Sequence, residues 1–170
     1  MIVHEIVTER LILRALRKED SAEVVTIWGD KENGKYLCDP YYESAEQLSE
    51  LLNDIHESPV YYFAASLKGT EKIMATCSIG PEDDDLSTWG IGYTVRKKHW
   101  GNGYACEMVR MLIEFAREHN AQAVIGTVAK ENYASNRIMQ KCGFQIVQES
   151  SFQKSDTDIT YPSYIYKLYL

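Results

Sequence analysis

Hydrophobic positions along the chain follow two periods, one of two residues and one close to 3.6 residues. Short apolar runs rich in β-branched and aromatic residues are typical of strands, whereas apolar residues at i, i+3, i+4 and i+7 are typical of one face of a helix. The first pattern predicts seven strands, over about residues 11–16, 60–67, 73–79, 87–96, 123–128, 144–148 and 164–170. The second predicts four helices, over about residues 20–28, from 44, from 103 and over 133–141.

Helix ends are marked by residues that favour them. The run Ser44-Ala45-Glu46-Gln47 matches a capping box, in which Ser and Gln satisfy free backbone donors. Gly29 and Gly143 are placed to stop the first and last helices. The third helix carries an apolar stripe that should face the core, formed by Met108, Val109, Leu112, Phe115 and Ala116. No repeat, low-complexity tract or linker divides the chain, so we predict one mixed α/β domain over residues 1–170.

Composition and charge narrow the class of protein. The chain has 170 residues, 45% hydrophobic and 25% charged, with 18 basic and 25 acidic side chains and a net charge of −7. That sign disfavours nucleic acid as a partner. No apolar run approaches the roughly 20 residues that cross a bilayer, and the first five residues do not resemble a secretory signal. The four cysteines are widely spaced, without a C-x-x-C pair, which favours reduced thiols, no metal site and a cytoplasmic protein.

The segment from Tyr93 to Met108 carries the clearest chemical signal. An apolar strand runs into a loop with two glycines, Gly101 and Gly103, and the loop opens into the amphipathic helix. Such a loop leaves backbone N–H groups uncovered at the positive end of a helix, where a phosphate or pyrophosphate binds. The basic run Arg96-Lys97-Lys98 is either a solvated turn or a counter-charge for a small phosphorylated ligand.

Two other glycine patterns are less specific. The run from Gly29 to Lys35 has the spacing of a P-loop, but Tyr36 replaces the required Ser or Thr and a helix precedes it, so we predict a turn. Gly90-Ile91-Gly92 lacks the third glycine of a dinucleotide fingerprint. Glycines inside a strand mark a bulge or a close approach of another group.

The run Trp100-Gly101-Asn102-Gly103-Tyr104-Ala105 resembles motif A of the GNAT N-acetyltransferases, in which Trp100 replaces the usual Arg or Gln. That departure is similar to the branch containing the ribosomal-protein alanine N-acetyltransferases. Thr8 to Arg14 resembles the same branch, and so does Asn132 to Arg137, which continues to Lys141-Cys142-Gly143-Phe144. The resemblance therefore covers three separated segments in the family's order.

The resemblance implies a mostly antiparallel sheet in which two central parallel strands splay apart and hold acetyl-CoA. In this arrangement the strand ending at Val95 would contact the pantetheine arm, and a bulge at Gly90 and Gly92 would open the gap. Asn136 either assists or is an ordinary exposed helix residue. The implied cofactor-binding residues are Tyr93, Thr94, Val95, Trp100, Gly101, Asn102, Gly103, Tyr104, Ala105, Asn132 and Asn136.

The resemblance also implies direct attack of an amine on the thioester, with a backbone N–H near Val95 as oxyanion donor. Met139 stands where many relatives have a tyrosine that protonates the leaving thiolate. Ser135 matches the serine that takes this role in the ribosomal branch; otherwise it only supports the helix start. The general base is left open between a water chain and several side chains, namely Asp84, Asp85, His99, Glu107, Asp156 and Asp158.

The acceptor is left open between a protein N-terminus and a small amine. The acidic run from Glu82 to Asp85 would attract a cation or is a solvated loop. Aromatic residues expected on the acceptor side are Trp28, Tyr36, Tyr41, Tyr42 and Tyr161. The main alternative function is a non-catalytic acyl-CoA-binding regulatory module, and the resemblance is compatible with a homodimer.

Overall fold

One eight-stranded sheet forms the centre of the computed structural model, which describes residues 4–55, 58–82 and 86–170. The strand order is β1-β2-β3-β4-β5-β6-β8-β7, and every neighbouring pair is antiparallel except β5 and β6. The strands are β1 (Ile6–Val7), β2 (Leu11–Ala15), β3 (Tyr61–Leu67), β4 (Ile73–Pro81), β5 (Thr88–Val95), β6 (Ala123–Ala129), β7 (Gln145–Gln153) and β8 (Thr160–Tyr169). The helices are α1 (Ser21–Trp28), α2 (Ala45–Asp54), α3 (Tyr104–Glu118) and α4 (Tyr133–Lys141). Among the described residues, no helix is long and apolar enough to span a bilayer.

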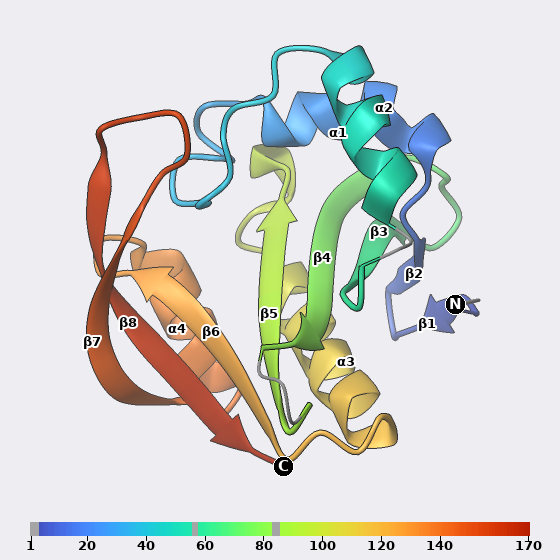
Figure 1. Ribbon diagram of the computed structural model, residues 1–170. Coiled ribbons are helices and arrows are strands. Elements are labelled where there is room, and N and C mark those ends of the chain that lie inside the picture. Colours follow the sequence, from blue (N-terminus) through green and yellow to red (C-terminus); the bar gives the residue numbers. More distant parts are fainter. Residues whose placement is uncertain (1–3, 56–57, 83–85) are drawn as a thin grey trace.

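The two faces of the sheet carry separate hydrophobic cores. Phe63 and Ala65 of β3 belong to the core beneath α3, whereas Ala64 between them belongs to the core beneath α1 and α2. This division follows from the alternation of side chains along a strand. Figure 1 shows α3 and α4 behind the sheet and α1 and α2 across its upper end.

The predicted elements agree closely with the structure. The stripe predicted for α3 is buried throughout, α4 has the predicted bounds, and Gly29 caps α1. The eighth strand is the two-residue β1, which is too short to show a period. Strands β7 and β8 are longer than predicted. The hydrophobic pattern missed residues 149–153 and 160–163 because these residues are mostly polar.

The central parallel strands splay apart, as predicted. Pairing between β5 and β6 covers only residues 88–90 against 123–125, and Figure 1 shows the two strands diverging beyond that point. The predicted bulge is wrong, because β5 pairs with β4 from Trp89 to Val95 without a register shift. Gly90 and Gly92 instead allow close approach, since an added Cβ would collide with Glu82 or with Ser78 Oγ.

Candidate active site

The side of β5 beyond Gly90 faces the gap and carries backbone groups that β6 does not pair. Arg96 donates its N–H to Met74 O of β4 at 2.9 Å. Successive residues of a strand direct their backbone N–H and C=O groups to opposite sides of the strand. The backbone groups of Tyr93 and Val95 therefore point into the gap, and those of Thr94 point toward β4. Val95 C=O accepts a 2.6 Å bond from Trp100 Nε1, which fits this orientation. The Val95 N–H therefore points where β6 would otherwise pair.

The loop after β5 is shaped by two glycines with positive φ. Gly101 and Gly103 have φ of +76° and +80°, in a region of backbone conformation that residues other than glycine rarely adopt. A Cβ at Gly101 would meet nothing within 4 Å, and Gly103 caps α3 without a side-chain hydrogen bond. Asn102 turns back on the loop, donating from Nδ2 to His99 O and Trp100 O. The start of α3, with Tyr104 and Ala105, thus presents uncapped N–H donors beside open space.

Residues of the turn between β1 and β2 hold this loop in place. Glu107 of α3 accepts hydrogen bonds from Thr8 Oγ1 at 2.6 Å and from Arg10 N and Nε, each at 2.7 Å. Arg10 also donates to Asn102 O at 2.8 Å and lies over the Tyr104 ring. Burial alone would raise the pKa of Glu107, but these hydrogen bonds outweigh it and hold the pKa below its ordinary value. Glu107 therefore fixes the loop and is a poor candidate for the general base.

The start of α4 is organised by two asparagines. Asn132 Oδ1 accepts from Ser135 N at 3.2 Å and so caps the helix. Asn136 is buried, which excludes the exposed alternative, and its Nδ2 donates to Ala129 O at 3.0 Å and to Asn132 O at 2.8 Å. Tyr166 of β8 completes this set by donating to Asn136 Oδ1 at 2.8 Å. These bonds fix the turn between β6 and α4 on the far side of the gap.

Ser135 lies in the first turn of α4 and contacts a residue of β5. Its Oγ is 2.6 Å from the hydroxyl oxygen of Tyr93, so a hydrogen bond crosses from one side of the gap to the other. Sequence reasoning had assigned Tyr93 a backbone role alone, and no spacing rule links it to a residue 42 positions away.

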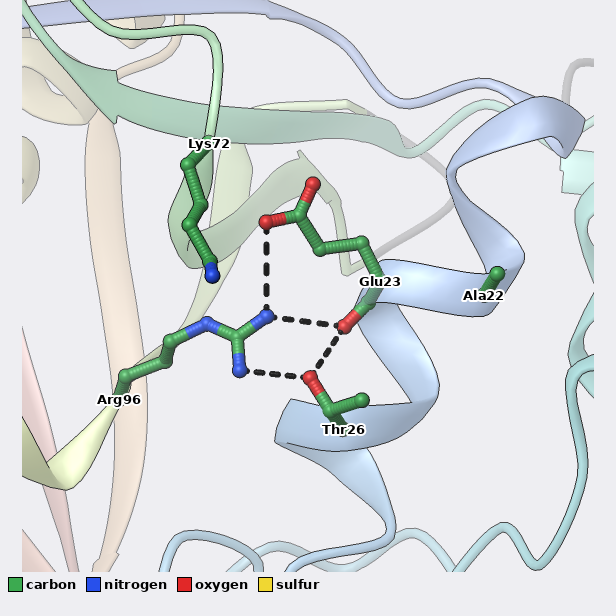
Figure 2. A pocket seen from close by; sticks show the side chains of 5 residues that line it. All are labelled: Ala22, Glu23, Thr26, Lys72 and Arg96. Carbon is green, nitrogen blue, oxygen red and sulfur yellow. Dashed lines mark hydrogen bonds and ion pairs between the residues drawn. The ribbon is translucent and has the colours of Figure 1, made fainter.

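The basic run after β5 is directed mostly toward α1 and away from the glycine loop. Arg96 donates to Ile73 O and Thr26 Oγ1, and to Glu23 O. Lys97 pairs with Glu32 at 2.6 Å. Figure 2 shows the surface pocket of about 650 Å³ beside this arginine, lined by Ala22, Glu23, Thr26, Lys72 and Arg96. Arg96 thus braces the chain against α1 and Lys97 against the loop that follows it, and the counter-charge interpretation does not apply to them.

The opposite, acceptor side combines the α1–α2 loop with the β7–β8 hairpin. Lys154 of the hairpin is buried, and its Nζ donates to Gly34 O, Leu37 O and Asp39 O at 2.9, 3.0 and 2.7 Å. Burial lowers the pKa of this ammonium. The aromatic residues expected here contact one another. The ring centroids of Trp28 and Tyr42 are 5.7 Å apart. Two contacts join the loop to the hairpin: the ring centroids of Tyr36 and Tyr161 are 5.3 Å apart, and Lys154 Nζ lies 4.1 Å from the centroid of the Tyr41 ring.

The remaining acid–base candidates are dispersed. Asp84 and Asp85, within the acidic run, lie outside the described residues. His99 packs edge-on against Tyr104, and burial lowers its pKa, with Lys98 and Arg96 acting in the same direction. Asp156 and Asp158 lie in the loop of the β7–β8 hairpin.

The cysteine thiols are poorly suited to nucleophilic attack. Burial raises the pKa of Cys77, of Cys38 and of Cys142, the last to about 11. A thiol must ionise to attack, so these three are weaker nucleophiles near neutral pH than an ordinary thiol.

A parallel strand pair that splays before an uncapped glycine loop and helix is the arrangement that the resemblance to the acetyl-CoA-dependent acyltransferases implies. Residues 10–145 match the family model described as an acetyltransferase (GNAT) domain. The chain is 30% identical over 143 residues to the uncharacterized N-acetyltransferase p20 of Bacillus licheniformis, covering 81% of this chain and 80% of that protein. The chain belongs to the GNAT acetyltransferase family and is an acetyl-CoA-dependent N-acyltransferase.

Solved structures show the same fold. A GNAT acetyltransferase of Bacillus anthracis superposes with a TM-score of 0.85 at 21% identity, covering 98% of both chains. The ribosomal-protein-S5-alanine acetyltransferase of Vibrio fischeri gives 0.81 at 14% identity, covering 98% of this chain and 97% of that one. The spermidine N-acetyltransferase of Vibrio cholerae, in complex with CoA and spermine, gives 0.83 at 18%, covering 94% and 95%.

Proposed function

We propose that this protein transfers an acetyl group from acetyl-CoA to a primary amine, by direct attack within a ternary complex. The observation that carries the proposal is the continuity of two binding surfaces: the unpaired side of β5 leads directly into the uncapped glycine loop. An extended chain with amides pairs with such an edge, and a pyrophosphate binds such a helix start. The pantetheine arm and pyrophosphate of acetyl-CoA occur in this order.

The cofactor contacts follow from the directions of these groups. Tyr93 and Val95 meet the pantetheine arm through their backbone, with Thr94 between them facing β4. The amides from Gly101 to Ala105 hold the pyrophosphate, and Trp100 fixes the loop to the strand. Asn132 contacts the cofactor with its Nδ2, while Asn136 acts through the turn that it holds.

The acetyl thioester supplies an activated carbonyl carbon, and the chain supplies the polar groups around it. Val95 N–H points into the gap and donates to the carbonyl oxygen as negative charge develops on it. Ser135 donates to the departing sulfur. The weakly nucleophilic thiols of Cys38, Cys77 and Cys142 support direct transfer without an acyl-cysteine.

The acceptor is a cationic amine, drawn from protein N-termini or small amines. Asp39 and Asp156 act on Tyr42, whose pKa burial raises to about 12, so two carboxylates lie near the aromatic residues of the acceptor side. Solved structures with the same fold are named for an alanine of ribosomal protein S5 and for spermidine. The fold therefore accommodates both classes of acceptor.

Thermal unfolding with acetyl-CoA tests the cofactor site. A ligand at 100 times its Kd should stabilise the protein by about 2.7 kcal/mol, and ATP should give no comparable shift. Gly103→Glu should abolish the acetyl-CoA shift, because it places a carboxylate at the pyrophosphate. Gly69→Glu is the matched control, since Gly69 also has a positive φ and open surroundings but lies in the β3–β4 turn. An equal loss in both variants, or no shift in the wild type, would refute the site.

Thiol release tests the reaction. The protein is incubated with acetyl-CoA and one of three acceptors: a peptide beginning with alanine, spermidine or an aminoglycoside. We expect CoA release that depends on the acceptor, with the peptide preferred. Tight CoA binding without release by any acceptor would support the regulatory-module alternative.

We also propose that the protein is cytoplasmic. The four cysteines are free thiols, which supports a cytoplasmic protein. A homodimer stays a prediction, which light scattering of the purified protein checks.

A further inference from the structure

The hydrogen bond between Tyr93 and Ser135 has no part in the cofactor contacts proposed above. Tyr93 lies in the portion of β5 that β6 leaves unpaired, and Ser135 lies in the helix that follows β6. Their oxygens are 2.6 Å apart, within the usual range for two hydroxyl groups. Side chains from the two sides of the gap thus meet directly.

The two hydroxyl groups together leave one hydrogen unused. Each carries a single O–H donor, and one of the two is consumed between them. Either oxygen could be the donor by geometry; a phenol is a more acidic donor than an alkyl hydroxyl, which favours donation from Tyr93 to Ser135 Oγ and leaves the Ser135 hydrogen available. Neither hydroxyl has a further side-chain hydrogen bond within residues 4–55, 58–82 and 86–170.

The surroundings of Tyr93 keep it in the donor form. Burial raises the pKa of Tyr93, and this effect exceeds the opposite effect of the Ser135 hydrogen bond. The phenol therefore stays protonated near neutral pH and supplies a hydrogen bond to Ser135 at every pH at which the reaction is measured.

We propose that Tyr93 orients the Ser135 hydroxyl toward the sulfur of CoA, so that the pair acts as one hydrogen-bond donor to the departing thiolate. The inference rests on the acetyltransferase function proposed above. Val95, the proposed oxyanion donor, is two residues along the same strand, about 7 Å away.

The ammonium of the acceptor first loses a proton to water, and the uncharged nitrogen then bonds to the carbonyl carbon and passes a second proton to water as the amide forms. When the bond between carbon and sulfur breaks, its electron pair stays on sulfur, and Ser135 O–H donates to the resulting thiolate. No proton leaves the pair, because Tyr93 keeps its own hydrogen while donating it to Ser135. Ser135 is then the catalytic residue and Tyr93 a positioning residue.

Binding of CoA compared with desulfo-CoA, which lacks the sulfur, tests the pair without any turnover. Calorimetry gives both affinities at about pH 7 and about pH 9, on either side of an ordinary thiol pKa. In the wild type, the ratio of the Kd of desulfo-CoA to the Kd of CoA should increase roughly tenfold from about pH 7 to about pH 9, as expected for a hydrogen bond to a charged sulfur. Tyr93→Phe and Ser135→Ala should each lose this increase and keep the wild-type affinity for desulfo-CoA.

Kinetics give a second measurement. Tyr93→Phe should lower kcat by roughly tenfold and leave KM for acetyl-CoA unchanged, and the double variant with Ser135→Ala should be no slower than Ser135→Ala alone. Ser135→Thr, which keeps a hydroxyl, should restore the pH-dependent preference for CoA. The matched control is Tyr169→Phe, an exposed tyrosine on β8 that should behave as the wild type.

Three results would overturn the inference. One is a wild type that binds CoA and desulfo-CoA with the same ratio at both pH values. Another is a Tyr93→Phe protein that retains the wild-type ratio. The last is an equal loss of affinity for both ligands in Tyr93→Phe and Ser135→Ala, which indicates a purely structural contact. Failure of the wild type to bind either ligand would instead refute the acetyltransferase site itself.

Discussion

The two sides of the proposed site, a cofactor side for acetyl-CoA and an acceptor side for the amine, are built by different means. On the cofactor side, a strand, a glycine loop and a helix follow one another within residues 88–118, and backbone groups form most of the binding surface. On the acceptor side, the α1–α2 loop meets a hairpin that is about 115 to 120 residues away, where Lys154 Nζ donates to Gly34 O and Asp39 O and Ser155 N donates to Cys38 O. Local backbone geometry defines most of the first surface, whereas contacts between distant segments organise the second.

This difference explains why sequence reasoning reached one surface more easily. Backbone conformation restricts which residue types can occur at a position, because glycine, asparagine and serine are selected where particular dihedral angles or helix caps are needed. A lysine that donates to three distant carbonyls has the same appearance in the sequence as a lysine in water. Variants that disturb one side alone should therefore separate cofactor binding from acceptor binding.

The largest effect should come from Asn136→Ala, on the cofactor side. It removes the amide that holds Ala129 O and Asn132 O and leaves the buried Tyr166 hydroxyl without its acceptor. We expect a loss of about 3 kcal/mol in unfolding free energy and weaker acetyl-CoA binding, measured by denaturation and calorimetry. Arg137→Ala, the exposed neighbour, should change neither quantity. Equal effects of the two substitutions would contradict the role of the turn.

Lys154→Met tests the acceptor side. Three carbonyls lose their donor, so the loop from Gly34 to Asp39 should loosen, at a cost of about 2 kcal/mol. KM for the amine should rise several-fold while the Kd of acetyl-CoA stays unchanged, as measured by steady-state kinetics and calorimetry. Lys31→Met, an exposed lysine of the same loop, is the control. If acetyl-CoA affinity falls as much as amine affinity, the two sides are not separable.

Glu107→Gln should make the cofactor side less sensitive to acid. The pKa of Glu107 is held below its ordinary value of 4.5, so its stabilising effect is complete above about pH 4.5 and is lost as pH falls through the lowered pKa. The variant should be less stable by about 1–2 kcal/mol at neutral pH and show a shallower loss of stability on acidification. Denaturant titrations between about pH 3 and 7 measure this, with Glu114→Gln, exposed on α3, as control. A parallel acid profile for wild type and Glu107→Gln would argue against the assigned role.

The smallest effect should come from Tyr166→Phe, which tests how much the role of Asn136 depends on the Tyr166 hydroxyl. It deletes one hydroxyl and leaves the two bonds from Asn136 Nδ2 intact. We expect a loss of about 1 kcal/mol in unfolding free energy and unaltered acetyl-CoA affinity. A loss as large as that of Asn136→Ala would place the main support of the turn in β8.

Hydrophobic periodicity predicts the four α-helices of the described residues, and the family resemblance predicts the splayed strands, but the site is predicted only in part. Gly101 and Gly103 are identified because a glycine loop before a helix leaves backbone N–H groups uncovered, whereas Asn132 and Ser135 are identified through the family resemblance. Thr8 and Arg10 were noticed through the family resemblance, while their bonds to Glu107 emerged from the structure. Contacts such as Tyr93 with Ser135 depend on how distant elements are juxtaposed, which residue spacing does not encode.

The unpaired stretch of β5 has a consequence for the lifetime of the protein in the cell. A sheet that is interrupted at its centre leaves backbone N–H groups that acetyl-CoA, bound as proposed, would satisfy. Ligand that binds only the folded chain lowers the population of opened forms, and degradation follows that population when opening is fast. On the proposed function, proteolysis of the protein should therefore slow when acetyl-CoA is plentiful and quicken when it is scarce.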